Sequence, residues 1–237
     1  SIEDLAGYIL SSSSILPKEQ RSVALPFSRS GDGNGALSYS LSPSQLRFWF
    51  AERLQPQSTV NTIAVAVRLE GHLDADVLES SLQALVDRHE QLRSTFSERH
   101  GEPCQFVHHT MSVGLRREDL SHLPVTQRAQ ALNDLVMRAS QHGFDLVKGP
   151  LVHALFIRME PQVATLIVVC HHLIIDGWSM GVLCRELSMI YCATIDGQSI
   201  ELPKRQGEYH DYVAWHRAWL LAGGRERQLA YWEQQLG

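Results

Sequence analysis

Two adjacent histidines, His171 and His172, are followed closely by Asp176 and Gly177. An imidazole titrates near neutral pH and can exchange a proton with an amine or a hydroxyl group. A carboxylate a few residues away can orient such a ring or bind an arginine, and a glycine permits a close backbone approach or a positive φ. Because polar groups that follow an apolar run are costly to bury without partners, we expect these four residues to form a site.

The apolar run over residues 164–170 is typical of a buried strand, and we expect that strand to extend to His172. Ser179 stands where a helix N-cap is expected, ahead of a helix over 180–193. The histidines therefore belong to a turn between a core strand and a helix, where α/β folds usually carry their chemistry. Since neighbouring strand residues point to opposite faces, one ring is expected to face the interior and the other a cleft.

The residues alone leave three interpretations open. In the plainest, the histidines merely end a strand and Asp176-Gly177 merely turns the chain. A metal site is the second, but opposite-facing neighbours do not easily share one ion and no HExxH or CxxC pattern accompanies them, so we predict no metal. We favour the third, in which one histidine does general acid–base or positioning work.

The pattern His171, His172, Asp176, Gly177 and Ser179 resembles the HHxxxDGxS signature of the condensation domains of nonribosomal peptide synthetases.

Three further motifs are similar to those of this family and follow in the family's order. Residues 42–50, SPSQLRFWF, resemble SxAQxRLW, with Pro43 and Phe48 as departures. Residues 88–96, RHEQLRSTF, resemble RHExLRTxF, and residues 209–215, YHDYVAW, resemble YxDFAVW.

The resemblance implies one lobe of a chloramphenicol-acetyltransferase-like fold: an α/β (α+β) two-layer sandwich with a mixed sheet packed against helices. It also implies peptide-bond formation between two thioester substrates. These would be delivered on the phosphopantetheine arms of upstream and downstream carrier proteins, with no cofactor bound by the chain itself. Residues 178–180 resemble the subtype that takes an L-configured donor.

By motif match, the resemblance implies that His172 is the active-site histidine, acting as a base or as a positioner of the nucleophile. His171, Asp176 and Gly177 would then support the site. Asp176 would pair with an arginine, for which Arg88 is the expected match. Possible tunnel or positioning residues are Trp178, Ser179, Arg47 and Arg93, and Arg93 is also the alternative partner of Asp176. From its position alone, Arg88 equally suits a cation at a helix C-terminus.

Composition sets further bounds. The chain is 44% hydrophobic and 20% charged, which is ordinary for a globular protein. Its net charge of −5 gives no support for a nucleic-acid partner. We expect no membrane association, since apolar runs are short and no signal pattern is present. The four cysteines lack disulfide or zinc spacing, which favours a reducing, cytoplasmic setting.

We expect three segments. Residues 1–10 form a short amphipathic helix that resembles the last helix of a carrier protein, although a terminal helix without that role remains an alternative. Residues 11–37 are rich in serine and then glycine and are interpreted as a linker. Residues 38–237 resemble an N-terminal lobe only, because family domains are about twice as long. The C-terminal lobe would then be a missing partner, and the chain alone is expected to be inactive and to expose an apolar face.

Within the last segment, Ser42 and Gln45 form a capping box that starts a helix, with Pro43 at its first position. Leu46, Trp49, Phe50 and Leu54 are expected to form its buried stripe. Further strands are expected at 63–69, 92–97, 103–109 and 151–159, and further helices from Asp74 and over 124–142, 209–221 and 226–236. The tryptophans of the last two helices, Trp215, Trp219 and Trp232, are expected as core or interface anchors.

Two competing functions remain. A coenzyme-A-dependent acyltransferase of the same superfamily would share the histidine motif, and a non-catalytic platform that binds carrier proteins would share the fold. The four ordered motifs and the carrier-like helix favour the peptide synthetase.

Overall fold

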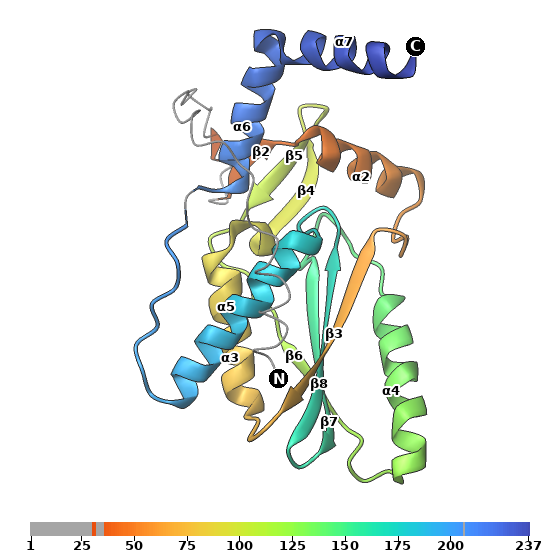
Figure 1. Cartoon of the computed structure of the whole chain (residues 1–237), viewed down its shortest axis with the longest axis vertical. Helices are drawn as coiled ribbons and strands as arrows, with labels where there is room; N and C mark the ends of the chain where they lie inside the picture. The colour runs from red at the N-terminus through yellow and green to blue at the C-terminus, as the bar shows by residue number, and fades with distance from the viewer. Residues whose placement is uncertain (1–29, 32–35, 206) are drawn as a thin grey trace.

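The computed structural model describes residues 30–31, 36–205 and 207–237. Its larger sheet has the strand order β3-β8-β7-β6. These strands are β3 (Thr62–Glu70), β8 (Val163–His171), β7 (Val152–Glu160) and β6 (Leu115–Asp119). The β6–β7 pair is parallel and the other pairs are antiparallel. The expected fold class, a mixed sheet packed with helices, is therefore confirmed (Figure 1).

A second, fully antiparallel sheet has the order β1-β2-β5-β4. Its strands are β1 (Ser30–Gly31), β2 (Leu37–Ser40), β5 (Glu102–Val107) and β4 (Ser94–Arg99). The predicted hairpin is thus present as β4–β5. The predicted linker is wrong at its end, because Ser30–Gly31 and Leu37 pair in this sheet. The rest of that linker and the carrier-like helix over 1–10 lie outside the described residues, apart from Ala36.

Helices cover both faces of the larger sheet (Figure 1). On one face lie α3 (Ala75–Arg88) and α5 (Gly177–Ile195), and on the other lies α4 (Val125–Ser140). The smaller sheet is flanked by α2 (Pro43–Leu54) and α6 (Tyr209–Trp219), and a short 3₁₀ turn, η1 (Glu90–Arg93), precedes β4. A kink at η2 (Leu220–Gly224) turns the chain into α7 (Arg225–Leu236). Among the helices of the described ranges, none has the length and hydrophobicity of a membrane span.

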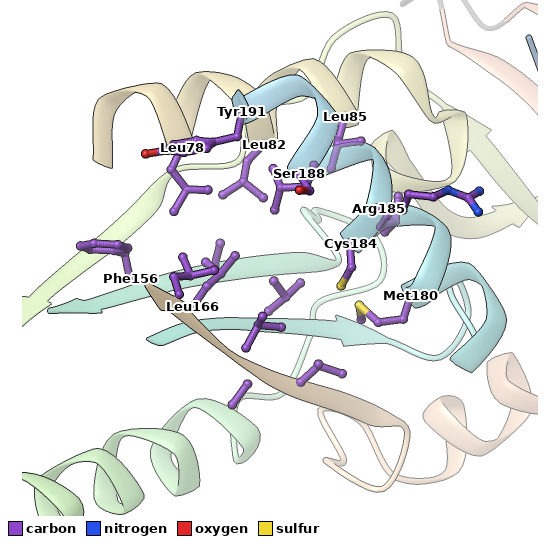
Figure 2. A pocket seen from close by; sticks show the side chains of 18 of the residues that line it. Leu78, Leu82, Leu85, Phe156, Leu166, Met180, Cys184, Arg185, Ser188 and Tyr191 are labelled. Atoms are coloured by element: carbon purple, nitrogen blue, oxygen red, sulfur yellow. The ribbon is translucent and has the colours of Figure 1, made fainter. Parts of the chain in front are cut away.

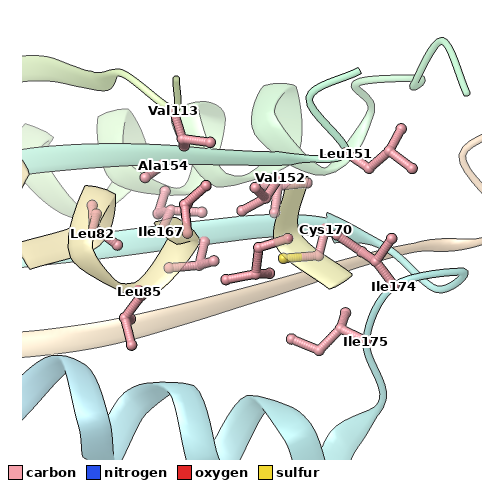
Figure 3. Close-up of a cluster of buried hydrophobic side chains, with 14 of the residues drawn as sticks. Leu82, Leu85, Val113, Leu151, Val152, Ala154, Ile167, Cys170, Ile174 and Ile175 are labelled. Atoms are coloured by element: carbon pink, nitrogen blue, oxygen red, sulfur yellow. The ribbon is translucent and has the colours of Figure 1, made fainter. Parts of the chain in front are cut away.

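The core joins the turn after the histidines to the sheet. Figure 3 shows Ile174 and Ile175 of that turn beside Cys170 at the end of β8. Ile174 and Ile175 are 6% and 5% exposed. Burying an aliphatic side chain of this size contributes about 1.5–3 kcal/mol, so the turn is held by the same cluster that holds the sheet. The side chains predicted to face inward on α3 are confirmed as buried: Leu78, Leu82, Leu85 and Val86.

The expected buried stripe of α2 is wrong in part. On α2, Phe50 and Leu54 are 58% and 88% exposed, whereas Gln45 and Glu52 are buried beside Trp49. The inner face of α2 is polar because it meets buried amides and a buried imidazole. Trp232 is 55% exposed because α7 buries no residue, and Trp215 on α6 is 38% exposed, so neither side chain is a core anchor, and their expected role as interface anchors stays a prediction.

Candidate active site

His171 is the interior member of the histidine pair. It is fully buried at the end of β8, and its backbone N–H donates to Leu151 O at 3.0 Å. Its ring Nδ1 accepts a hydrogen bond from the N–H of Leu173 at 3.0 Å. Burial, and then the neighbouring His172, lower the pKa of His171 to about 4. The ring is therefore neutral near pH 7.

His172 is the partly exposed member. Its backbone N–H donates to Asn61 O at 2.8 Å, which ties it to the loop before β3. Its ring stacks on Phe48 of α2, with centroids 4.7 Å apart and planes 19° apart. The guanidinium of Arg47 lies 5.0 Å from the Phe48 ring centre. The expectation that the two rings have different environments is confirmed, and His172 is not sealed in the interior.

Asp176 begins the helix that follows. Its carboxylate Oδ1 accepts from the backbone N–H of Ser179 at 2.8 Å and from its hydroxyl at 2.6 Å. Asp176, not Ser179, is thus the N-cap of α5, because an aspartate is as good a cap as a serine and Gly177 continues into helix. The hydroxyl of Ser179 holds the pKa of Asp176 below its ordinary value, although partial burial opposes the shift.

Gly177 does not have a positive φ, since it is the first residue of α5 and has a helical backbone. A Cβ added there would meet no atom within 4 Å. Beside it, Trp178 is 62% exposed. The backbone at the start of α5 therefore faces open space rather than a close neighbour.

The predicted pairing of Asp176 with Arg88 or Arg93 is wrong in this structure. Arg88 Nε donates to Glu186 Oε2 of α5 at 2.9 Å. Arg93 lies 3.8 Å from Glu90 and donates to the carbonyl of His108. Asp176 is exposed and already accepts two hydrogen bonds from Ser179, whereas the buried carboxylate of Glu186 needs a cationic partner.

Glu186 also accepts from His89, whose Nε2 lies 2.7 Å from its Oε2. Burial would raise the pKa of Glu186, but the bonds from His89 and Arg88 outweigh it and hold the pKa below its ordinary value. Arg88 and His89 of the second motif therefore fasten α3 to α5.

A chain of buried amides supports the histidine turn and was not predicted from the sequence. Gln45 Nε2 donates to Gln105 Oε1 at 3.3 Å and lies 3.4 Å from Leu173 O. Gln105 Nε2 in turn donates to Ser94 Oγ at 2.8 Å. The available signal was the predicted capping box, in which Ser42 and Gln45 are paired as expected. The network connects α2, the smaller sheet and the turn after His172.

The last motif, residues 209–215, contacts residues of the first two motifs, 42–50 and 88–96. Tyr209 at the start of α6 lies 3.0 Å from the hydroxyl of Ser42. His210 stacks on Tyr39, with centroids 4.0 Å apart, and its Nδ1 lies 3.2 Å from Glu90 Oε2. The four motifs found in the sequence are therefore brought into one region around the N-termini of α2, α5 and α6.

Two cavities flank the larger sheet. One of about 510 Å³ lies between the sheet and helices α3 and α5 and is mainly apolar (Figure 2). The other, of about 720 Å³, lies under α4 beside β6 and β7. Neither includes His172 in its lining, so the predicted channel at that ring stays a prediction. Within the part of the chain that the structure describes, no three histidine, cysteine or carboxylate side chains are grouped as a metal site would require.

Comparison with known proteins agrees with this geometry. A family model described as Condensation domain matches residues 36–237. The chain is 40% identical over 197 residues to a linear gramicidin synthase protein of Brevibacillus parabrevis, covering 83% of this chain and 4% of that protein. It is 32% identical over 213 residues to phosphinothricin tripeptide synthetase PhsC of Streptomyces viridochromogenes, covering 90% of this chain and 19% of that protein. The chain thus spans a small part of these relatives.

Solved structures show the same fold. The starter condensation domain of rhizomide synthetase RzmA superposes with a TM-score of 0.75 at 22% identity, over 84% of this chain and 50% of that chain. The first condensation domain of the calcium-dependent antibiotic synthetase gives 0.76 at 24%, over 84% of this chain and 47% of that chain. Together with the matched motifs, these findings show that the chain belongs to the condensation domain family of nonribosomal peptide synthetases.

Proposed function

We propose that this chain carries the histidine site at which two carrier-tethered substrates are joined by a peptide bond. The acceptor amine attacks the carbonyl carbon of the donor thioester. A C–N bond forms, the C–S bond breaks, and the proton lost by the amine ends on the departing thiol. Both substrates would arrive on the phosphopantetheine arms of carrier proteins.

His172 is the side chain that meets the amine in this proposal. The observation that carries it is the contrast within the pair: His171 is buried and neutral, whereas His172 is partly exposed and held by Phe48 and Asn61. A positioned imidazole can take up the amine's proton or orient the amine for attack. Asp176 and Gly177 hold the turn and leave space beside it.

We further propose that residues 38–237 act as the N-terminal lobe of a two-lobed domain, since the superposed condensation domains are about twice as long as the matched part. The 237-residue chain alone is then inactive, because a complete water-excluding cavity supplies a large share of an enzyme's rate. An upstream carrier domain ending at residues 1–10 belongs to the same proposal.

The test is His172→Ala in the complete domain, with product measured by intact mass on the acceptor carrier. We expect product formation to fall by a factor of about 100 or more, since a positioned acid–base group contributes about 10²–10⁴. Carrier binding should be retained. His122→Ala is the matched control, because it removes the same ring from an exposed position in the loop before α4.

Other outcomes would contradict the proposal. Unchanged product in His172→Ala would favour a non-catalytic carrier-binding platform. Product formed from acyl-coenzyme A but not from a loaded donor carrier would favour a coenzyme-A-dependent acyltransferase. Comparison of L- and D-configured donors tests the L-donor subtype, which rests on residues 178–180.

A further inference from the structure

We propose that Glu52 is a positioning residue of this site, whose carboxylate, together with the N–H of Leu173, holds the buried ring of His171 in the tautomer with its proton on Nε2. The same carboxylate holds the loop over residues 55–61. The inference rests on the proposed function only for its catalytic consequence, because the tautomer can be observed without turnover.

Glu52 and His171 present two buried polar atoms to each other. Glu52 is 7% exposed and His171 0% exposed. His171 Nε2 and Glu52 Oε2 lie 3.7 Å apart, and neither atom has a hydrogen-bond partner among the described residues. A bridging water would hold them about 4.5 Å apart or more, because it needs about 2.8 Å on each side. The two atoms therefore face each other directly.

The other ring nitrogen fixes where the proton lies. Nδ1 of His171 accepts from the N–H of Leu173 at 3.0 Å, so in the neutral ring the proton is on Nε2. Burial and the neighbouring His172 keep the ring neutral near pH 7, since they lower the pKa of His171 to about 4. The Nε2–H group is thus a donor that lies beside Glu52 Oε2.

The polar neighbours of the Glu52 carboxylate are donors. Its Oε1 accepts from the backbone N–H of Gln57, and its Oε2 faces His171. A carboxylate accepts at both oxygens, whereas a glutamine amide has one acceptor end and one donor end. Either orientation of a glutamine at position 52 would set an NH₂ group against an N–H group. Burial raises the pKa of Glu52, and the backbone bonds from Gln57 and Ser58 oppose that shift.

The loop held by Glu52 reaches the active-site histidine. Gln57 has a left-handed backbone, with φ of 58°, and its carbonyl oxygen lies so close to Gly143 that a Cβ there would overlap it. The loop runs on to Asn61, whose carbonyl accepts the N–H of His172. Glu52 therefore supports His172 from two sides, through the preceding ring and through the loop that binds its backbone.

The test uses the 237-residue chain labelled with ¹⁵N-histidine, because imidazole nitrogen shifts distinguish the two tautomers. We expect His171 in the wild-type chain to carry its proton on Nε2 alone near pH 7. Glu52→Gln should shift or broaden both His171 nitrogen resonances, whereas Glu52→Asp, which keeps two acceptors, should restore the tautomer in part. Arg53→Gln is the matched control, since Arg53 is the exposed neighbour on the same helix.

If His171 in the wild-type chain is protonated on Nδ1, the inference is overturned. This measurement needs no variant, so it decides the question even if Glu52→Gln does not fold. Unchanged His171 resonances in a folded Glu52→Gln would also overturn it. In the complete domain, Glu52→Gln should lower kcat by about tenfold with little change in KM, because misplacing a reacting group costs rate. If Glu52→Gln is fully active and His172→Ala is inactive, this inference alone is rejected. If His172→Ala is active, the proposed function is rejected, and the tautomer result is unaffected.

Discussion

The ring of His172 stacks on the ring of Phe48, with centroids 4.7 Å apart and planes 19° apart. Phe48 comes from α2, and His172 follows β8, so the contact joins the first motif of the sequence to the third. It fixes the plane of the imidazole on one side and leaves the other side free of ring contacts among the described residues.

Phe48→Leu should lower peptide-bond formation in the complete domain by about tenfold, because the imidazole loses the surface that orients it. The lost stacking should cost about 0.5–1.5 kcal/mol in the free energy of unfolding. Kinetics and urea denaturation measure the two effects. Phe50→Leu, a 58% exposed phenylalanine on the same helix, should change neither, and equal losses in both variants would contradict the assignment.

Asp176→Ala should lower the free energy of unfolding by about 1 kcal/mol at pH 7, since it removes an N-cap, and Asp176→Asn by less. The hydrogen bond from the Ser179 hydroxyl holds the folded pKa of Asp176 below the ordinary 3.8. Its contribution is therefore present above pH 3.8 and is lost as pH falls through the lower folded pKa. Urea denaturation should show that the wild-type protein exceeds Asp176→Ala in free energy of unfolding by less at low pH than at pH 7. A constant difference would contradict the cap.

Glu186→Gln should lower the free energy of unfolding by about 3 kcal/mol, because it leaves the partly buried Arg88 without its counter-charge. Replacing both partners, as Arg88→Met with Glu186→Leu, should cost less than the sum of the single changes. A double-mutant cycle measures this coupling. Additive costs would show that the pair contributes no interaction of its own.

Gly143→Ala should destabilise the fold by about 1–3 kcal/mol, because its Cβ would overlap the carbonyl oxygen of Gln57 and the loop would have to move. Gly114→Ala is the matched control, since a Cβ there meets nothing within 4 Å. Thermal unfolding of both variants is the measurement. Similar melting temperatures for the two variants would show that the 55–61 loop can move without a loss of stability.

Local signals in the sequence predicted much of this fold. The capping box at Ser42 and the N-cap at Asp74 are where the sequence indicates, because a cap is decided within three residues. The hairpin around His100-Gly101 follows from turn residues, and β8 follows from its apolar run, although it ends at His171 rather than at the expected His172. Such features need no knowledge of distant parts of the chain.

Partners that are distant in the sequence could not be predicted in the same way. Arg88 lies 98 residues before Glu186, and spacing alone does not say which carboxylate it meets. Glu52 was missed because a buried acid on an apolar-looking helix has no local signature. The cap at Asp176 could have been found, since an aspartate three residues before Ser179 is itself a good N-cap.

The amide chain through Gln45, Gln105 and Ser94 has a direction, because an amide has unlike ends and each member sets the orientation of the next. Hybrid proteins that take residues 36–60 from one relative and residues 90–110 from another would therefore have to inherit matching members on both sides of the junction. A crossover that replaces Gln105 by a residue without an acceptor would leave Gln45 Nε2 without that partner beneath the histidine turn. Hybrid proteins should fold where Gln45, Gln105 and Ser94 all come from one parent.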